Sequence, residues 1–126
     1  MYNAIISDHF MNPRNIGEII HPDLEFRIGN PICGDTIHVC VNFHESRIKE
    51  IKYKAYGCAT SIATASIFSE CVQGKAIDEL AGMTRAGHAE MLGELEPNQK
   101  HCLDILDELF DSFHEREGAS RDKSLF

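Results

Sequence analysis

The chain has 126 residues, of which 43% are hydrophobic, so it is long enough to fold as one domain with a buried core. Its formal net charge of −8 disfavours nucleic acid and anionic membranes as partners, because phosphate contacts would work against the overall field. No apolar run approaches the roughly 18 residues of a membrane span, and residues 1–15 lack the pattern of a signal peptide. The five cysteines are therefore expected to be reduced thiols in the cytoplasm.

The first predicted element is a short helix over residues 2–11. Ile6 and Phe10 recur at helical spacing, and the pattern ends at Asn12 because a residue before proline avoids the helical region. His9 lies within this helix. We interpret it as a residue at the polar edge rather than a metal ligand, since one histidine on a helix is weak evidence for a site.

Three strands are predicted next, over residues 24–28, 35–43 and 47–56. The second strand alternates most clearly, with apolar side chains on one face: Ile37, Val39, Val41 and Phe43. The turn at 44–46 is short, so the last two strands are expected to form an antiparallel hairpin. Together the strands predict a small antiparallel sheet with one covered face.

Helices are predicted from residue 61 onward. A helix over 61–72 is closed by Gly74, and a short helix follows over 76–81. Gly82 and Gly87 interrupt two further short segments. The sequence therefore changes from strands to helices at about its midpoint.

The last helix is expected after a loop at 95–100, with Asn98 as its N-cap. Strands followed by helices indicate an α+β fold, a three-stranded antiparallel sheet with helices packed on one face. Residues 1–117 would form a single domain and 118–126 a polar, flexible tail. The last helix should cover the sheet with one apolar face: Cys102, Ile105, Leu106, Leu109, Phe110 and Phe113.

Three cysteines lie beside turn residues or at a helix start, in Gly29-Asn30-Pro31-Ile32-Cys33-Gly34-Asp35, Tyr56-Gly57-Cys58-Ala59-Thr60-Ser61 and His101-Cys102. Cys58 and Cys102 stand at predicted helix N-termini, where unpaired N–H groups stabilise a thiolate. Asp35 is either a second ligand from the Cys33 loop or an ordinary turn residue. Convergence of three thiols with one harder ligand suits an iron–sulfur cluster or zinc. The two remaining cysteines are assigned to packing: Cys40 and Cys71.

These motifs, preceded by Asn12-Pro13-Arg14-Asn15-Ile16-Gly17, resemble the IscU/NifU-type iron–sulfur cluster assembly scaffolds over residues 2–113. The resemblance implies an IscU/SufE-like sandwich and a scaffold rather than an enzyme. Such a scaffold builds a transient [2Fe–2S] cluster from iron and sulfur and passes it to apo iron–sulfur proteins. A PLP-dependent cysteine desulfurase would supply the sulfur. By motif position, the metal and cluster ligands fall on Cys33, Asp35, Cys58, His101 and Cys102.

The alternatives to a cluster scaffold are functions that depend on zinc. The related SufU-type sulfur acceptors usually lack a histidine before the last cysteine and carry an insertion ahead of it. The presence of His101 and the compact length of the chain therefore favour an IscU-type scaffold over a SufU-type acceptor. A zinc-dependent sulfur acceptor is the alternative and a zinc-stabilised interaction domain the third hypothesis. Three thiolates with Asp35 or His101 also satisfy tetrahedral zinc, and the isolated protein could therefore hold zinc. Five candidate ligands for four places favour a site that exchanges its contents.

The segment before His101 departs from the family pattern. Family members typically carry a Leu-Pro-Pro-Val-Lys-like segment there, which a dedicated DnaK-type chaperone recognises. The corresponding residues here are Leu95-Glu96-Pro97-Asn98-Gln99. The departure weighs against that chaperone as a partner and leaves the ligand positions untouched.

Overall fold

The computed structural model of the chain describes residues 2–30 and 35–118. Within these ranges it has a three-stranded antiparallel sheet of order β1-β2-β3, formed by β1 (Leu24–Asn30), β2 (Asp35–His44) and β3 (Arg47–Tyr56). β2 and β3 form the predicted hairpin. Its two turn residues, Glu45 and Ser46, have positive φ angles of 54° and 67°. Turns of this kind match the right-handed twist of the strands they connect.

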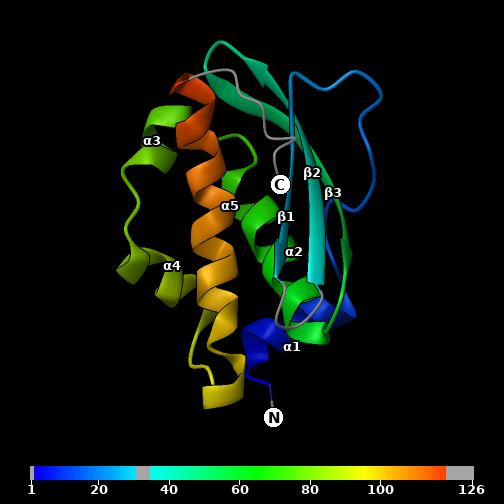
Figure 1. Cartoon of the computed structure of the whole chain (residues 1–126), viewed down its shortest axis with the longest axis vertical. Helices are drawn as coiled ribbons and strands as arrows, with labels where there is room; N and C mark the ends of the chain where they lie inside the picture. Colours follow the sequence, from blue (N-terminus) through cyan, green and yellow to red (C-terminus); the bar gives the residue numbers. More distant parts are fainter. Residues whose placement is uncertain (1, 31–34, 119–126) are drawn as a thin grey trace.

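Helices lie on one side of the sheet (Figure 1). In chain order they are α1 (Ala4–Met11), α2 (Ala59–Val72), α3 (Ile77–Ala81), α4 (Arg85–Leu92), the 3-10 turn η1 (Pro97–Gln99) and α5 (His101–Gly118). The predicted α+β class, with helices against one face of a three-stranded sheet, is confirmed. Within the described ranges, every helix is too short or too polar to cross a membrane.

The core lies between that face of the sheet and the helices α2 and α5. Phe113 of α5 meets Phe26 of β1 edge-on, with ring centroids 5.8 Å apart. Phe68 of α2 packs between Phe110 and Phe113, at 5.1 and 5.8 Å. All six residues of the predicted apolar face of α5 are buried. Since each large apolar side chain stabilises the fold by about 1.5–3 kcal/mol when buried, this interface holds sheet and helices together.

The segment between α1 and β1 lies on the other side of the sheet, where Figure 1 shows it as a blue loop. Residues 15–17 run beside β3, and two backbone hydrogen bonds hold them there. Gly17 donates its N–H to the carbonyl of Tyr53 at 2.9 Å, and Tyr53 donates to the carbonyl of Asn15 at 3.1 Å. This segment thus pairs with the free edge of β3.

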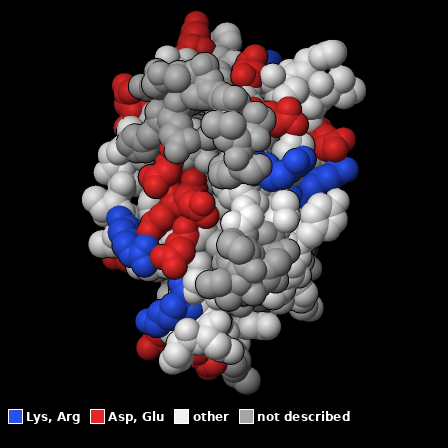
Figure 2. Space-filling model, in the orientation of Figure 1, with Lys and Arg blue, Asp and Glu red and all other residues white. Residues whose placement is uncertain are grey.

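Acidic side chains account for much of the surface over α5 (Figure 2). This helix contributes several partly or fully exposed carboxylates: Asp104, Asp107, Glu108 and Asp111. Arg85 of α4 makes ion pairs with two of them, Asp104 and Asp107. Part of the negative charge of the chain therefore lies on a solvated helix face.

Several predicted boundaries were wrong. Asn98 does not cap the last helix, because residues 97–99 form η1, which Glu96 caps, and α5 begins only at His101. The expected loop at 95–100 thus contains a helical turn. Gly87 lies inside α4 instead of interrupting it, and its backbone N–H donates to the hydroxyl of the N-cap Thr84 at 3.2 Å. The predicted tail at 118–126 lies almost wholly outside the described residues.

Candidate metal centre

Cys58 lies where the chain leaves β3 and enters α2. Gly57 turns the chain with a φ of 142°, a conformation that favours glycine. Cys58 then takes the extended N-cap conformation, and its carbonyl accepts the first helical N–H groups, from Ser61 and Ile62, both at 3.1 Å. The predicted placement of Cys58 directly before a helix is confirmed, although α2 begins at Ala59 rather than at residue 61.

The thiol of Cys58 is exposed and has three polar neighbours. Its Sγ lies 3.2 Å from Thr60 Oγ1, 3.3 Å from Ser61 Oγ and 3.8 Å from His101 Nε2. Burial of its inner side raises the pKa of the Cys58 thiol, but hydrogen bonds from Ser61, Thr60 and His101 outweigh it and lower the pKa to about 7. About half of the molecules therefore carry a Cys58 thiolate at neutral pH, and the thiolate is the form that binds metal.

The first turn of α5 places its two candidate ligands in different surroundings. His101 is partly exposed and directs Nε2 toward Cys58, 43 residues earlier in the chain. Cys102, the next residue, is fully buried and belongs to the apolar core. These two neighbours thus face different sides of the helix start.

Asp35 and Cys33 come from the connection between β1 and β2. Asp35 opens β2 and pairs with Asn30, and its neighbour Thr36 pairs with Tyr56 at the end of β3. This register brings the backbone of Asp35 to the same end of the sheet as Cys58. The side chain of Asp35, and Cys33 altogether, lie outside the described residues.

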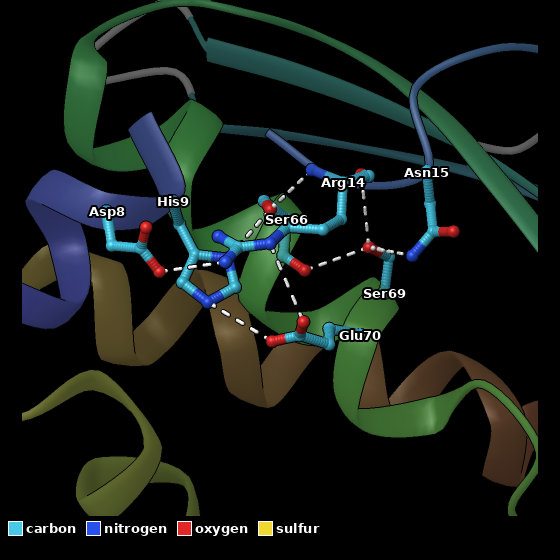
Figure 3. A network of polar contacts seen from close by, with 7 residues as sticks. All are labelled: Asp8, His9, Arg14, Asn15, Ser66, Ser69 and Glu70. Carbon is cyan, nitrogen blue, oxygen red and sulfur yellow. Dashed lines mark hydrogen bonds and ion pairs between the residues drawn. The ribbon is translucent and has the colours of Figure 1, made fainter. Parts of the chain in front are cut away.

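A polar network anchors α2 behind the site (Figure 3). Ser66 of α2 lies 2.8 Å from His9 Nδ1 and accepts the backbone N–H of Arg14 at 2.9 Å. One turn further on, Asn15 donates its side-chain amide to Ser69 at 3.0 Å. Each bond contributes about 1 kcal/mol net. The Asn-Pro-Arg-Asn segment that follows α1 therefore fixes the helix whose first turn holds Cys58.

His9 is a buried member of this network, so its interpretation as a polar-edge residue was wrong. Its side chain is 9% exposed, and Nε2 lies 3.3 Å from Glu70. Burial, together with the charge of Arg14, lowers the pKa of His9, while Glu70 and Asp8 oppose that shift. Tertiary packing of α1 on α2 encloses a residue that the helical pattern had placed near the surface.

Comparison with known proteins shows the family. The model of the NifU-like N terminal domain matches residues 1–112. The chain belongs to this family. It is 41% identical over 105 residues to the iron–sulfur cluster assembly scaffold protein IscU 1 of Archaeoglobus fulgidus, covering 83% of this chain and 69% of that one.

Solved structures related to the NifU-like N-terminal domain share its fold. The crystal structure of the N-terminal part of a NifU-like protein from Brucella abortus superposes with a TM-score of 0.71 at 20% identity, covering 94% of this chain and 95% of that one. A candidate iron–sulfur cluster assembly scaffold of the SUF system from Fervidobacterium islandicum gives 0.60 at 21% identity, over 89% and 88%. At these identities the likeness concerns the fold alone.

Two residues of this NifU-like site were missed in the sequence, Thr60 and Ser61. Both are buried, and both hydroxyls lie within 3.3 Å of the Cys58 thiol. Hydroxyl residues two and three positions after an N-cap cysteine would have been the signal, because the first turn folds back over the cap.

The two cysteines assigned to packing differ in their burial. Cys40 is 2% exposed, and Cys71 is partly buried against the core. Burial raises the pKa of both thiols above the ordinary value. In both, burial outweighs the neighbouring groups that would lower the pKa of the thiol.

Proposed function

We propose that this chain, an iron–sulfur cluster assembly scaffold like its IscU relatives, builds a transient [2Fe–2S] cluster on five residues. They are the positions expected from the family motifs: Cys33, Asp35, Cys58, His101 and Cys102. The cluster is cargo that is assembled and passed to apo iron–sulfur proteins. Sulfur is supplied by a PLP-dependent cysteine desulfurase.

The observation that carries this proposal is the state of Cys58. Its thiol is exposed, its pKa is about 7, and His101 from the start of α5 lies 3.8 Å away. An accessible thiolate beside an imidazole is a ready ligand for iron, which sulfur and nitrogen donors bind well. A cysteine with only a packing role gains nothing from this arrangement.

The remaining ligands complete a site suited to release. Cys102 contributes a second thiol from the same helix start as His101, and Asp35 opens β2 at the same end of the sheet as Cys58. A carboxylate oxygen is a harder and weaker partner for cluster iron than a thiolate. A site with a surplus of ligands, one of them a carboxylate, holds its cargo loosely enough to hand it on.

Anaerobic reconstitution tests the proposal. The protein is incubated with ferrous iron, cysteine and a cysteine desulfurase, and its absorption spectrum is recorded. We expect visible sulfide-to-iron charge-transfer bands, which should be lost in Cys58→Ser. They should be retained in Cys71→Ser, which removes a thiol from the opposite end of the same helix.

The competing function is a zinc-dependent sulfur acceptor, since thiolates with His101 also suit tetrahedral zinc. It predicts that the protein takes up zinc and accepts a persulfide but develops no charge-transfer bands under any reducing condition. The contact between His101 and Cys58 favours the scaffold, because the SufU-type acceptors usually lack this histidine.

A further inference from the structure

A second group of metal-binding side chains lies on the outer face of the sheet, away from α2 and α5. One ligand atom each of Glu25, His38 and Cys40 lies within 4.8 Å of the other two. The closest approach is between His38 Nε2 and Glu25 Oε2, at 2.5 Å. The group combines an imidazole, a carboxylate and a thiol, the three ligand types that zinc accepts most readily.

Strand register explains why these side chains meet. Glu25 of β1 is paired directly with Cys40 of β2, and His38 precedes Cys40 by two residues. Residues two apart on a strand share a face, and directly paired residues of neighbouring strands have Cβ atoms about 5 Å apart. The convergence is therefore built into the backbone of the sheet and does not depend on a flexible loop.

Cys40 is enclosed although none of the helices in the described part of the chain covers its face of the sheet. It is 2% exposed. Burial raises the pKa of its thiol, while the backbone N–H of Ile19, from the segment between α1 and β1, works in the opposite direction. Backbone N–H groups that point at a cysteine sulfur are a common support for metal-bound thiolates. The segment between α1 and β1 thus closes one side of the group.

The outer side of the group is open. The side chain of His38 is 17% exposed and that of Glu25 53% exposed. His38 also lines a cavity of about 400 Å³ with Glu18, Arg27, Thr36, Lys54 and Tyr56. Among these, Lys54 is paired with Glu18 at 3.2 Å, which reduces its repulsion of a cation. The cavity gives a metal ion an entrance and room for a water molecule as a fourth ligand.

We propose that Glu25, His38 and Cys40 form a second metal site, which binds a divalent transition-metal ion of the zinc class. Three protein ligands with one open position are typical of sites whose metal reacts or exchanges, whereas structural zinc sites are closed by four ligands. A carboxylate and a thiolate together offset the charge of the ion. His38 is three residues along β2 from Asp35, roughly 10 Å, so both sites can be occupied at once.

Cobalt(II) is the probe, because its thiolate charge-transfer absorption reports a Co–S bond. The background is a variant in which Cys33, Cys58 and Cys102 are all serine, with folding checked by circular dichroism. We expect it to bind one equivalent of Co²⁺ with a thiolate band. Adding Cys40→Ser should abolish the band, adding His38→Ala should weaken binding roughly tenfold or more, and adding Cys71→Ser should change nothing. A folded background without the band, or a band that survives Cys40→Ser, overturns the proposal.

The intact chain provides a second measurement should the triple variant not fold. His38→Ala should weaken the binding of one Co²⁺ equivalent roughly tenfold or more relative to the natural sequence. His44→Ala is the matched control, since His44 also lies on β2 and near a glutamate, 3.8 Å from Glu45, but is 71% exposed. Equal affinities in the natural chain and His38→Ala overturn the proposal, and show His38 and Glu25 to be an ordinary ion pair beside a packed thiol.

Discussion

The two ends of α2 carry cysteines with opposite chemistry. Cys58 at the N-terminus has its pKa lowered to about 7, whereas burial raises the pKa of Cys71 near the C-terminus, against a smaller opposing effect of Lys75. Cys58 is the N-cap of this helix and is exposed, whereas Cys71 lies within the helix and is partly buried. The two also differ in hydrogen-bond donors, since Cys58 meets two hydroxyls and an imidazole. Reactivity is thus decided by the polar neighbours of each thiol.

The strongest test of this contrast is alkylation with iodoacetamide at pH 7, followed by peptide mass mapping in the metal-free protein. About half of the Cys58 thiols are ionised at this pH, against at most a few per cent for an ordinary or raised thiol. We expect Cys58 to react roughly tenfold faster than Cys71 or more, after allowing for the weaker nucleophilicity of a low-pKa thiolate. Equal rates would remove the contrast.

The next largest effect should follow removal of the hydroxyls at the N-terminal end. In Thr60→Val with Ser61→Ala, the Cys58 thiolate loses two donors, and the midpoint of its alkylation profile should rise by about one pH unit. Thr64→Val is the control, because the Thr64 hydroxyl is buried in the same helix but bonds to the Thr60 carbonyl at 2.7 Å. A similar shift in the control would assign the effect to general damage of α2.

A smaller shift is expected for His101→Gln. The imidazole lies 3.8 Å from the Cys58 sulfur, further than either hydroxyl, so its loss should raise the alkylation midpoint by only a few tenths of a pH unit. His44→Gln should leave the profile unchanged, since His44 lies at the exposed end of the hairpin. A shift larger than that of the double hydroxyl variant would make His101 the main stabiliser of the thiolate.

The smallest effect is expected from His9, which anchors the middle of α2 and whose protonation should change the stability of the fold. The folded pKa of His9 is lowered by burial, so the unfolded chain takes up a proton first as the pH falls. The stability that neutral His9 contributes is present above the unfolded pKa of about 6.5 and is lost as the pH falls toward the folded value. Urea unfolding between pH 8 and pH 5 should show this loss. In His9→Gln the dependence on pH should be flatter, and an unchanged slope would assign the loss to other groups.

Local pattern was enough for most of the fold. The alternation of Ile37, Val39 and Val41 predicted a half-covered strand, and the spacing in α5 predicted its buried face; both are observed. The helix boundaries were harder. Residues 97–99 form a separate 3-10 turn, which begins with a proline and is capped by Glu96. Asn98, a favourable N-cap residue, therefore caps neither this turn nor α5. Competing local signals of similar strength cannot be ranked from sequence alone.

For the site, the sequence by itself determined which residues carry the chemistry and where each stands in its own segment. Cys58 before a helix and His101 before Cys102 depend on local turn and helix signals, which act over a few residues. Only the tertiary structure decided which side chains from other segments surround them. It brought His101 to Cys58 across 43 residues, buried His9 against Ser66, and gathered Glu25, His38 and Cys40 through strand register. Such contacts depend on how whole elements pack, because burial and distance between remote segments are properties of the assembled core.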